Sequence, residues 1–331
     1  MQMRPFGRLG SVSAVSFGGG GIGGVYGAVA RAEAVATVRA AVAAGITLLD
    51  LAPTYGPGEL TPEAELIVGE AFGGRIPAGV GVTTKVMLTD SMSAVSLADR
   101  VKASLQASLN RLGAARVDLL FLHSYVRPTH LRCVSSEVID VATVRDVVRP
   151  ALARLEQEGL IRGWGLTGIG HPDAICDLLD EEPKPAAVEC VTNALDSVGD
   201  MWPFGVGEQP DNRRICSSAA RAGIAVMGIR AVAAGALTDR IDRPTQPTEP
   251  VAVDHGRASG FRQVARRLGV PSALLAYRYA LSLPHVSTVV VGAKTRTELA
   301  TCLAAEAAGP LDDTERAEVE RACSSLSGAA T

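Results

Sequence analysis

Short segments rich in valine, isoleucine and leucine alternate with longer amphipathic segments eight times along this chain. The segments expected to be strands are residues 12–17, 46–50, 80–86, 117–122, 161–166, 186–191, 224–229 and 286–291. The helices expected between and after them are 32–44, 62–72, 93–112, 144–158, 172–179, 212–222, 256–268, 272–281 and 296–305. Near-continuous apolar strands separated by helices indicate a parallel sheet that is buried on both faces. Eight such units in sequence are typical of a closed (β/α)8 barrel, whereas a six-stranded doubly wound sheet would leave units over.

One barrel of this kind accounts for the whole chain. The protein has 331 residues, of which 47% are hydrophobic and 20% are charged, a balance typical of a globular protein with a large core. We therefore expect residues 1–331 to form a single α/β domain, a TIM barrel. The formal net charge of −3 argues against a nucleic-acid partner and against an acidic membrane surface.

The cysteines and the N-terminus indicate the compartment. The six cysteines lie far apart and form no CxxC pair, which argues against a metal site or a disulfide framework and suits a reducing environment. No apolar signal segment opens the sequence, and no stretch reaches the ~18 apolar residues of a membrane span. The sequence therefore predicts a soluble cytoplasmic protein.

Two connections are longer than the others. Residues 124–142 follow the fourth strand, and residues 230–254, which contain three prolines, follow the seventh. Both lie on the carboxyl side of the strands, where barrel active sites are built. We interpret them as lids over a substrate and a cofactor, with simple surface insertions as the alternative.

Reactive side chains stand where three consecutive strands end. Asp50 ends the second strand and Tyr55 follows it, Lys85 ends the third strand, and His123 ends the fourth. Each residue alone could be structural: the aspartate a helix cap, the lysine an ion-pair partner, the histidine a packed ring. Because the carboxyl ends of barrel strands surround one mouth, we expect the four to converge on one pocket.

The four side chains form a coherent acid–base set. A tyrosine hydroxyl, with an ordinary pKa of ~10, is a weak acid at neutral pH. A nearby ammonium of Lys85 would favour the phenolate and lower the pKa of Tyr55, while Asp50 would hold that ammonium. His123 could donate a hydrogen bond to a substrate oxygen, so that the set could polarise a carbonyl and protonate the alkoxide. The set lacks a nucleophile and a metal, so a cofactor must bring the hydride.

The sequence around these residues resembles the aldo-keto reductase superfamily over nearly its whole length. The matching motifs are GITLLDLAPTYG at 45–56, TTKV at 83–86, SLNRLG at 108–113 with VDLLFLH at 117–123, EGLIRGWG at 158–165 and VVVGAKT at 289–295. The resemblance implies a (β/α)8 barrel that binds NADP(H), less often NAD(H). It also implies Tyr55 as general acid/base, Asp50 and Lys85 as its tuning pair, and His123 as the residue that orients the carbonyl.

The resemblance also implies where the cofactor binds. The positions that correspond to cofactor contacts are Gly20, Gly21, Asp50, Thr167, Gly168, Glu189, Ile229, Arg230, Ala231, Val232, Gly235, Leu237, Gly292, Lys294, Thr295, Glu298 and Cys302. Several depart from the family pattern near the nicotinamide. Thr167-Gly168 replaces the usual Ser-Asn, Glu189 replaces a Gln, and Ile229-Arg230 replaces an aromatic residue and a serine.

The positions at the adenosine end are mixed. Lys294 could bind a 2′-phosphate as a point charge, whereas Glu298 would accept hydrogen bonds from ribose hydroxyls and repel that phosphate. Cys302 stands where the family usually has an asparagine near the adenine. We expect NADP(H) in preference to NAD(H).

A glycine run at 18–24 matches the G-x-G-x-x-G pattern of dinucleotide-binding folds. A Rossmann turn would open a helix at once and place an acid ~20 residues later, but here the expected helix begins near residue 32. The glycines more readily allow close backbone approach over the barrel mouth.

The sequence thus predicts an enzyme that interconverts a carbonyl (aldehyde, ketone or sugar) and an alcohol. Candidate substrate contacts are Tyr26, Tyr55, Met87, His123, Tyr125 and Trp202, each of which could equally be packing. Two alternatives remain open. One is a barrel lyase that uses Lys85 as a Schiff-base nucleophile, and the other is a non-catalytic nucleotide-binding relative with a regulatory role.

Overall fold

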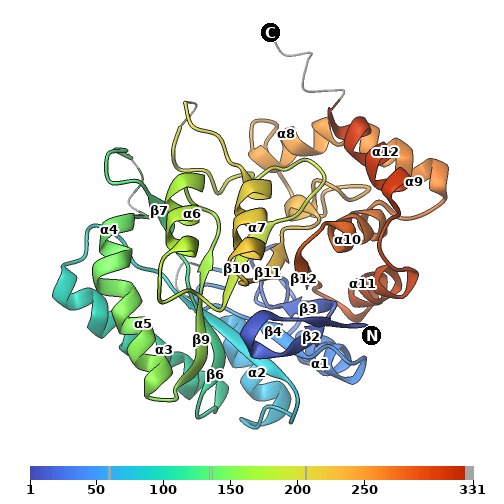
Figure 1. The fold of residues 1–331 in the computed structure, drawn as a ribbon. Coiled ribbons are helices and arrows are strands. Elements are labelled where there is room, and N and C mark those ends of the chain that lie inside the picture. Colours follow the sequence, from blue (N-terminus) through green and yellow to red (C-terminus); the bar gives the residue numbers. More distant parts are fainter. Residues whose placement is uncertain (59–60, 134, 136, 206, 325–331) are drawn as a thin grey trace.

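Eight parallel strands close into a barrel, as the sequence predicts. The protein is described here by a computed structural model that covers residues 1–58, 61–133, 135, 137–205 and 207–324. Around the barrel the strands follow the order β10-β11-β12-β3-β4-β5-β6-β9. Their bounds are β3 Val15–Gly18, β4 Leu48–Asp50, β5 Gly81–Val86, β6 Val117–Leu122, β9 Ile161–Thr167, β10 Ala187–Val191, β11 Ala225–Ile229 and β12 Val286–Gly292. The expected (β/α)8 TIM barrel is confirmed (Figure 1).

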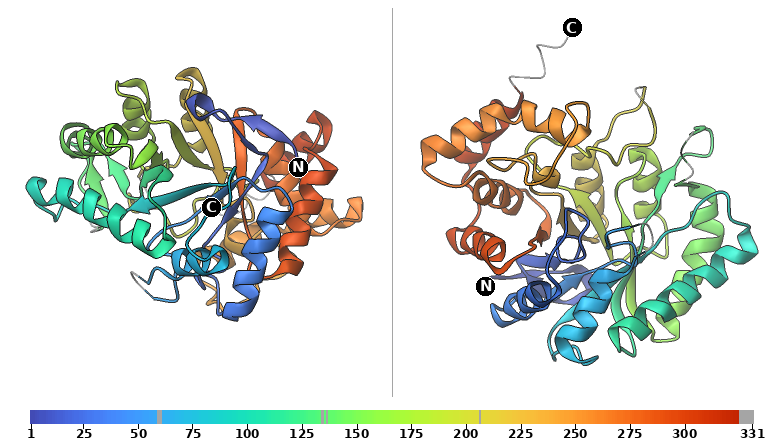
Figure 2. Two further views of the ribbon diagram at one scale, coloured as in Figure 1. Left: turned by 90° about the horizontal axis from the view of Figure 1, so that it is seen from below. Right: turned by 180° about the vertical axis from the view of Figure 1, so that it is seen from behind.

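Helices surround the barrel on its outside (Figures 1 and 2). Those that follow successive strands are α1 Arg31–Ala43, α2 Glu63–Phe72, α3 Ala94–Leu112, α5 Arg149–Gln157, α6 Pro172–Asp180, α7 Asn212–Arg221, α10 Ser272–Ser282 and α11 Arg296–Ala308. Neighbouring helices pack together in the pairs α1 with α2, α2 with α3, α3 with α5, α6 with α7 and α10 with α11, and α11 also contacts α1. The short helix α4 Val141–Thr143 and the π-helical turn η2 Val144–Val148 lead into α5.

The structure contains three further helices, and not all of them were predicted from the sequence. The segments α8 Pro250–Arg257 and α9 Ser259–Leu268 follow the seventh barrel strand, and α12 Asp313–Ser324 lies beyond the last predicted helix. Helix α12 packs against α9 and α10, and these helices gather at one side of the barrel in Figure 1. The sequence analysis missed α12 because its composition is strongly polar and only Val319 and Cys323 are buried.

The first predicted strand is in fact two strands. Residues Ser11–Ser13 form β2, which pairs antiparallel with β1 Met3–Pro5, and the barrel strand β3 begins only at Val15. Hydrogen bonds at Ser13 account for the break: its amide donates to Thr47 Oγ1 at 2.9 Å and its hydroxyl donates to the Val15 carbonyl at 2.7 Å. The chain between the two hairpin strands contains the 3-10 turn η1 Gly7–Leu9.

This hairpin fills the end of the barrel opposite to the strand carboxyl ends. Phe6 and Val12 pack with side chains of the barrel interior. The interior partners are Leu48, Leu119, Phe121, Ala186, Ala187, Ala225 and Met227. The interior is therefore a packed core, and the carboxyl ends of the strands are left to form a site.

The long connections have structure of their own. The one after β6 contains β7 Tyr125–Arg127 and β8 Val138–Asp140, which pair in parallel. The one after β11 contains the turn η3 Ala233–Gly235 and ends in α8. A third long connection, residues 192–211 between β10 and α7, was not singled out from the sequence. Among the helices of the described residues, none is both long enough and apolar enough for a membrane span.

Candidate active site

A buried ion pair lies at the carboxyl ends of β4 and β5. Asp50 is the last residue of β4, and Lys85 is the next-to-last residue of β5. The Lys85 Nζ lies 2.5 Å from Asp50 Oδ1, and Thr83 Oγ1 donates to the same oxygen at 2.6 Å. Asp50 is 2% exposed and Lys85 1%. The structure therefore brings together two of the four predicted catalytic residues as an ion pair shielded from water.

Lys85 has a second carboxylate partner that the sequence analysis did not foresee. The Nζ atom also lies 2.5 Å from Oε1 of Glu189, which enters from β10 across the barrel and is 1% exposed. The other oxygen of Glu189 accepts a hydrogen bond from Thr167 Oγ1 at 3.0 Å. Glu189 was expected only as a cofactor contact, but here it is part of the lysine's own ion-pair network.

Tyr55 and His123 complete the group. Their rings meet edge to face, with centroids 6.1 Å apart and an interplanar angle of 85°. The Lys85 Nζ lies 5.7 Å from the centroid of the Tyr55 ring. All four predicted catalytic residues therefore converge at one mouth, as the sequence analysis anticipated.

The loop that carries Tyr55 is fixed by its backbone. The Tyr55 carbonyl accepts a hydrogen bond from the amide of Ala64, in the first turn of α2, at 3.0 Å. This contact satisfies a free amide at the helix start. Gly23 of the glycine loop packs so closely that an added Cβ would lie 2.3 Å from the Tyr55 carbonyl oxygen. The glycine loop and α2 together hold the tyrosine in place.

Burial governs the acidity of Tyr55. It raises the pKa of the phenol well above its usual value, and the charges of Asp50 and Glu189 raise it further. The ammonium of Lys85 does lower the pKa of Tyr55, as expected, but it does not outweigh the other effects. Desolvation opposes the charged form of Lys85, yet Asp50 and Glu189 together raise its pKa. The resting site therefore holds a neutral phenol beside a firmly protonated lysine.

His123 is neutral in this site. Burial, and then the charge of Lys85, lower the pKa of His123 to about 3. Its Nδ1 is buried and has no hydrogen-bond partner among the described residues. A neutral ring has one N–H donor, and His123 can therefore offer a hydrogen bond, but no charge, to a substrate oxygen.

The candidate nicotinamide contacts surround this group. Thr167 is the last residue of β9 and Gly168 follows it, and the Gly168 amide donates to the Glu189 carbonyl at 2.7 Å. Ile229 ends β11 and is half-buried against an apolar cluster of Ile169, Val191 and Val198. An apolar face beside Thr167 and the buried pair suits one side of a planar ring.

The chain after β11 bends in a way that suits phosphate groups. Arg230, Ala233 and Ala234 have positive φ angles of 55°, 48° and 54°, which is strained for residues with a Cβ and is typical of ligand sites. The Nε of Arg230 is buried and has no partner among the described residues, while its Nη2 pairs with Asp200 at 3.1 Å. This donor set fits the pyrophosphate of a dinucleotide, although Ala231 and Leu237 are buried and offer only backbone.

Arg243 is a residue of this region that the sequence analysis missed. Its Nη1 donates to the Ala234 carbonyl at 2.9 Å, and its guanidinium lies 5.4 Å from the centroid of the Tyr26 ring. Through Arg243 the connection after β11 contacts the glycine loop that also holds Gly20 and Gly21.

At the predicted adenosine end of the cofactor site, Gly292, Lys294, Thr295 and Glu298 are exposed or half-buried. The Lys294 ammonium forms an ion pair with Asp242 and lies 4.0 Å from Glu298. Cys302 is 1% exposed and lies beside Tyr277 under the surface. Its thiol is therefore not accessible at the surface.

The sequence model of the Aldo/keto reductase family matches residues 14–323. The chain belongs to the aldo/keto reductase family. It is therefore an oxidoreductase, and enzymes of this family generally use NAD(P)H.

The chain is also similar to individual proteins of known name, two by sequence and one by structure. The chain is 29% identical over 294 residues to L-galactose dehydrogenase of Arabidopsis thaliana, covering 88% of this chain and 84% of that protein. It is 26% identical over 332 residues to pyridoxal 4-dehydrogenase of Microbacterium luteolum, covering 90% and 91%. The holo form of an aldo-keto reductase from Bacillus halodurans superimposes with a TM-score of 0.73 at 21% identity, covering 97% and 96%, which supports the fold.

The candidate substrate contacts lie in two groups. Tyr125 and Trp202 pack with Met201 and Ile229 around one apolar cluster. Tyr26 lies in the glycine loop, where its ring faces the guanidinium of Arg243. Tyr26, Met87, Tyr125 and Trp202 are all half-buried, so each keeps some surface that a ligand could reach.

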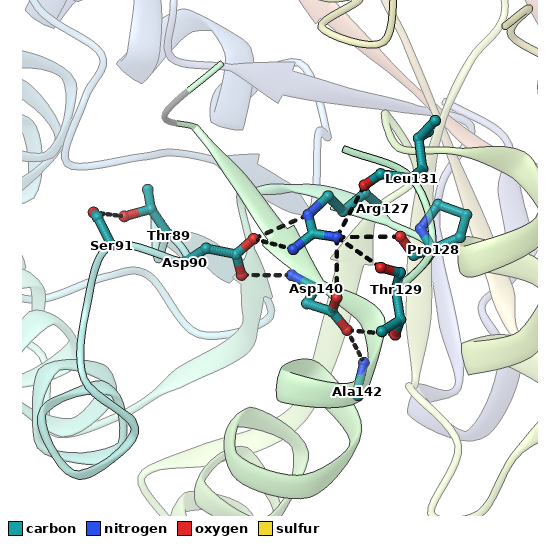
Figure 3. Close-up of polar contacts among 9 residues, drawn as sticks. All are labelled: Thr89, Asp90, Ser91, Arg127, Pro128, Thr129, Leu131, Asp140 and Ala142. Atoms are coloured by element: carbon teal, nitrogen blue, oxygen red, sulfur yellow. Dashed lines mark hydrogen bonds and ion pairs between the residues drawn. The ribbon is translucent and has the colours of Figure 1, made fainter. Parts of the chain in front are cut away.

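Arg127 holds the connection that carries Tyr125 (Figure 3). Its Nη2 and Nε donate to Asp90 Oδ2 at 2.8 and 3.0 Å, and its Nη1 lies 3.1 Å from Asp140 Oδ2. The same Nη1 donates to the carbonyl of Leu131 at 3.0 Å. Arg127 therefore ties the loop after β5 to the connection after β6, which carries Tyr125. The described residues contain no group of three or more His, Cys, Asp or Glu side chains suited to a metal ion.

Proposed function

We propose that the protein interconverts a hydroxyl and a carbonyl group on a small hydroxylated substrate, with Tyr55 as general acid/base. The observation that carries this proposal is the buried Asp50–Lys85 pair beside Tyr55 and a neutral His123. When bound, a nicotinamide cofactor supplies the donor or acceptor of the hydride. The protein's own residues then manage only the oxygen and its proton.

Each residue has a defined task at the substrate oxygen. Tyr55 gives its proton to that oxygen in reduction and takes it back in oxidation. The ammonium of Lys85 stabilises the charge that develops on the phenol oxygen during either transfer. His123 donates a hydrogen bond that orients the carbonyl.

The named relatives indicate the substrate class. One acts on L-galactose and another on pyridoxal, and both compounds are small aldehydes with hydroxyl groups. We propose the same class here, as aldehydes or as the cyclic hemiacetals that they form, in which the oxidised carbon already bears a hydroxyl group.

The cofactor that we propose is NADP(H), with Lys294 as the contact for the 2′-phosphate. The ion pair of Lys294 with Asp242 and the nearby Glu298 oppose this choice, because they offset its charge. NADP(H) over NAD(H) therefore stays a prediction, as do a cytoplasmic location and a single domain.

The structure gives less support to the two alternative functions, a lyase and a regulatory protein. A Schiff-base lyase needs a neutral amine at Lys85, but two carboxylates raise the pKa of that amine. A non-catalytic regulatory relative has no need of a complete acid–base group, and all four members are assembled here.

The test is turnover by the purified protein on a panel of L-galactose, other aldoses, pyridoxal and simple ketones, with each of the two cofactor pairs. We expect activity on at least one hydroxylated aldehyde, and tighter binding of NADPH than of NADH. Saturable cofactor binding without turnover on any member would favour the regulatory alternative. Inactivation by borohydride only when substrate is present would favour the lyase.

A further inference from the structure

The buried group at the candidate active site contains more negative charges than positive ones. Two carboxylates, Asp50 and Glu189, share one ammonium, that of Lys85, and all three side chains are at least 97% buried. Tyr55 and His123 are neutral. With both carboxylates ionised, the group carries one uncompensated negative charge away from water. Such a charge is costly unless it takes up a proton or meets a cation.

Glu189 is the member that takes up the proton. Burial, and the charge of Asp50, raise its pKa to about 7 against the opposing effect of Lys85. The groups that face it are Lys85 from β5, Asp50 from β4 and the Thr167 hydroxyl from β9. Its register partner on β11 is the uncharged Met227. No second cation among these neighbours balances it.

The oxidised nicotinamide ring carries a positive charge that the reduced ring lacks. Hydride transfer requires reacting atoms ~3–3.5 Å apart, and the reacting carbonyl must contact Tyr55. A nicotinamide ring in that position interacts electrostatically with the buried group of Asp50, Lys85 and Glu189. We propose that the protonation of Glu189 responds to the charge of the nicotinamide ring: the oxidised cofactor binds preferentially when Glu189 is ionised, whereas the reduced cofactor, whose ring is uncharged, binds both forms of Glu189 alike.

This inference rests on the proposed function and adds to it a positioning residue that sets which form of the cofactor the enzyme holds. A carboxylate with a pKa of about 7 is about one-tenth ionised at pH 6 and about nine-tenths ionised at pH 8, which follows from the titration curve. The affinity for the oxidised form should therefore improve with rising pH, while that for the reduced form should not.

The experiment measures dissociation constants of NAD+, NADH, NADP+ and NADPH between pH 6 and pH 8, by quenching of tryptophan fluorescence. In the wild type, the ratio of the reduced to the oxidised constant should rise ~10-fold over this range. The 2′-phosphate is common to NADP+ and NADPH, so its own titration cancels in their ratio. Glu189→Gln should make the ratio independent of pH and lower it ~10-fold at pH 8.

A matched control is Glu298→Gln, which removes a carboxylate at the predicted adenosine end of the cofactor site. This variant should change both dissociation constants of a cofactor pair by the same factor.

A second measurement needs no variant: calorimetry of the wild type at pH 7 in two buffers of different ionisation enthalpy. Binding of NAD+ should release about half a proton, and binding of NADH should not.

The outcomes separate the two claims. If the wild type binds neither cofactor pair, the proposed function fails and the inference fails with it. If both forms bind but their ratio is the same at pH 6 and pH 8, only the inference is overturned. A pH-dependent ratio that persists in Glu189→Gln also overturns it.

Discussion

Replacing Lys85 by methionine would leave Asp50 and Glu189 without their shared cation. Both carboxylates lie 2.5 Å from the Lys85 Nζ, so the two acceptor oxygens are at most about 5 Å apart. At an effective dielectric constant of about 20, two negative charges at that separation repel by about 3 kcal/mol. Removing one partner of a buried ion pair typically costs about 3–5 kcal/mol for the same reason. We expect Lys85→Met to lower the free energy of unfolding by about 3 kcal/mol at pH 8, or the Tm by about 4 °C for a chain of this length.

The loss should depend on pH in a defined direction. In the variant one carboxylate holds a proton more tightly in the folded protein than in the unfolded chain, so stability falls as pH rises toward its raised folded pKa. In the wild type the free energy of unfolding stops falling near pH 7, where Glu189 titrates. In Lys85→Met it continues to fall above pH 7, by about 1.4 kcal/mol per pH unit. The difference between the two proteins should therefore be about 1.4 kcal/mol smaller at pH 6 than at pH 8.

The assay is urea denaturation at the two pH values, with the double variant Lys85→Met/Glu189→Gln as control. The double variant removes one charge of each sign, so we expect it to recover most of the lost stability despite losing more hydrogen bonds. A double variant less stable than Lys85→Met at pH 8 would refute the reasoning. So would a loss in Lys85→Met that is the same at both pH values.

Three further predictions concern the residues around Tyr55. Because burial and Lys85 lower the pKa of His123 to about 3, no change of kcat near pH 6.5 should depend on His123; a change of kcat there that His123→Asn abolishes would contradict this. Gly23→Ala should lower kcat, because the added Cβ would lie 2.3 Å from the Tyr55 carbonyl oxygen; Gly256→Ala, whose Cβ meets open space, is the control with unchanged kinetics. Arg127→Lys should raise KM for the substrate by roughly 3–10-fold with little change in kcat, the equivalent of about 1 kcal/mol, because a lysine cannot reproduce the guanidinium's several contacts; equal effects on both constants would mean that Arg127 does more than hold the loop.

The barrel was predictable because its signal is repeated eight times. An error in one unit, such as the break at Ala14 between β2 and β3, leaves the count of units nearly unchanged. The break itself depends on hydrogen bonds from Ser13 to Thr47, 34 residues away, which no local pattern reveals. The parallel pair β7 and β8 is likewise invisible as a periodic pattern, since each strand has three residues.

The grouping of the four candidate catalytic residues was predictable because the ends of neighbouring strands must meet at one mouth. Asp50, Lys85 and His123 follow consecutive strands, so their convergence needs only the topology. The contact of Lys85 with Glu189 spans 104 residues and crosses the barrel. It depends on how far each side chain reaches into the interior, and topology alone does not specify that. For the same reason the net effect on the pKa of Tyr55 differed from the expectation based on Lys85 alone.

The central claim is that Tyr55 moves the proton at the substrate oxygen while a bound cofactor moves the hydride. The most direct test is single-turnover kinetics of Tyr55→Phe, with cofactor binding measured in parallel. The account predicts that the rate of hydride transfer falls about 10³-fold while the dissociation constant of the cofactor stays within about twofold of the wild type, because that change is under ~0.5 kcal/mol. A Tyr55→Phe protein that transfers hydride at the wild-type rate would contradict the claim.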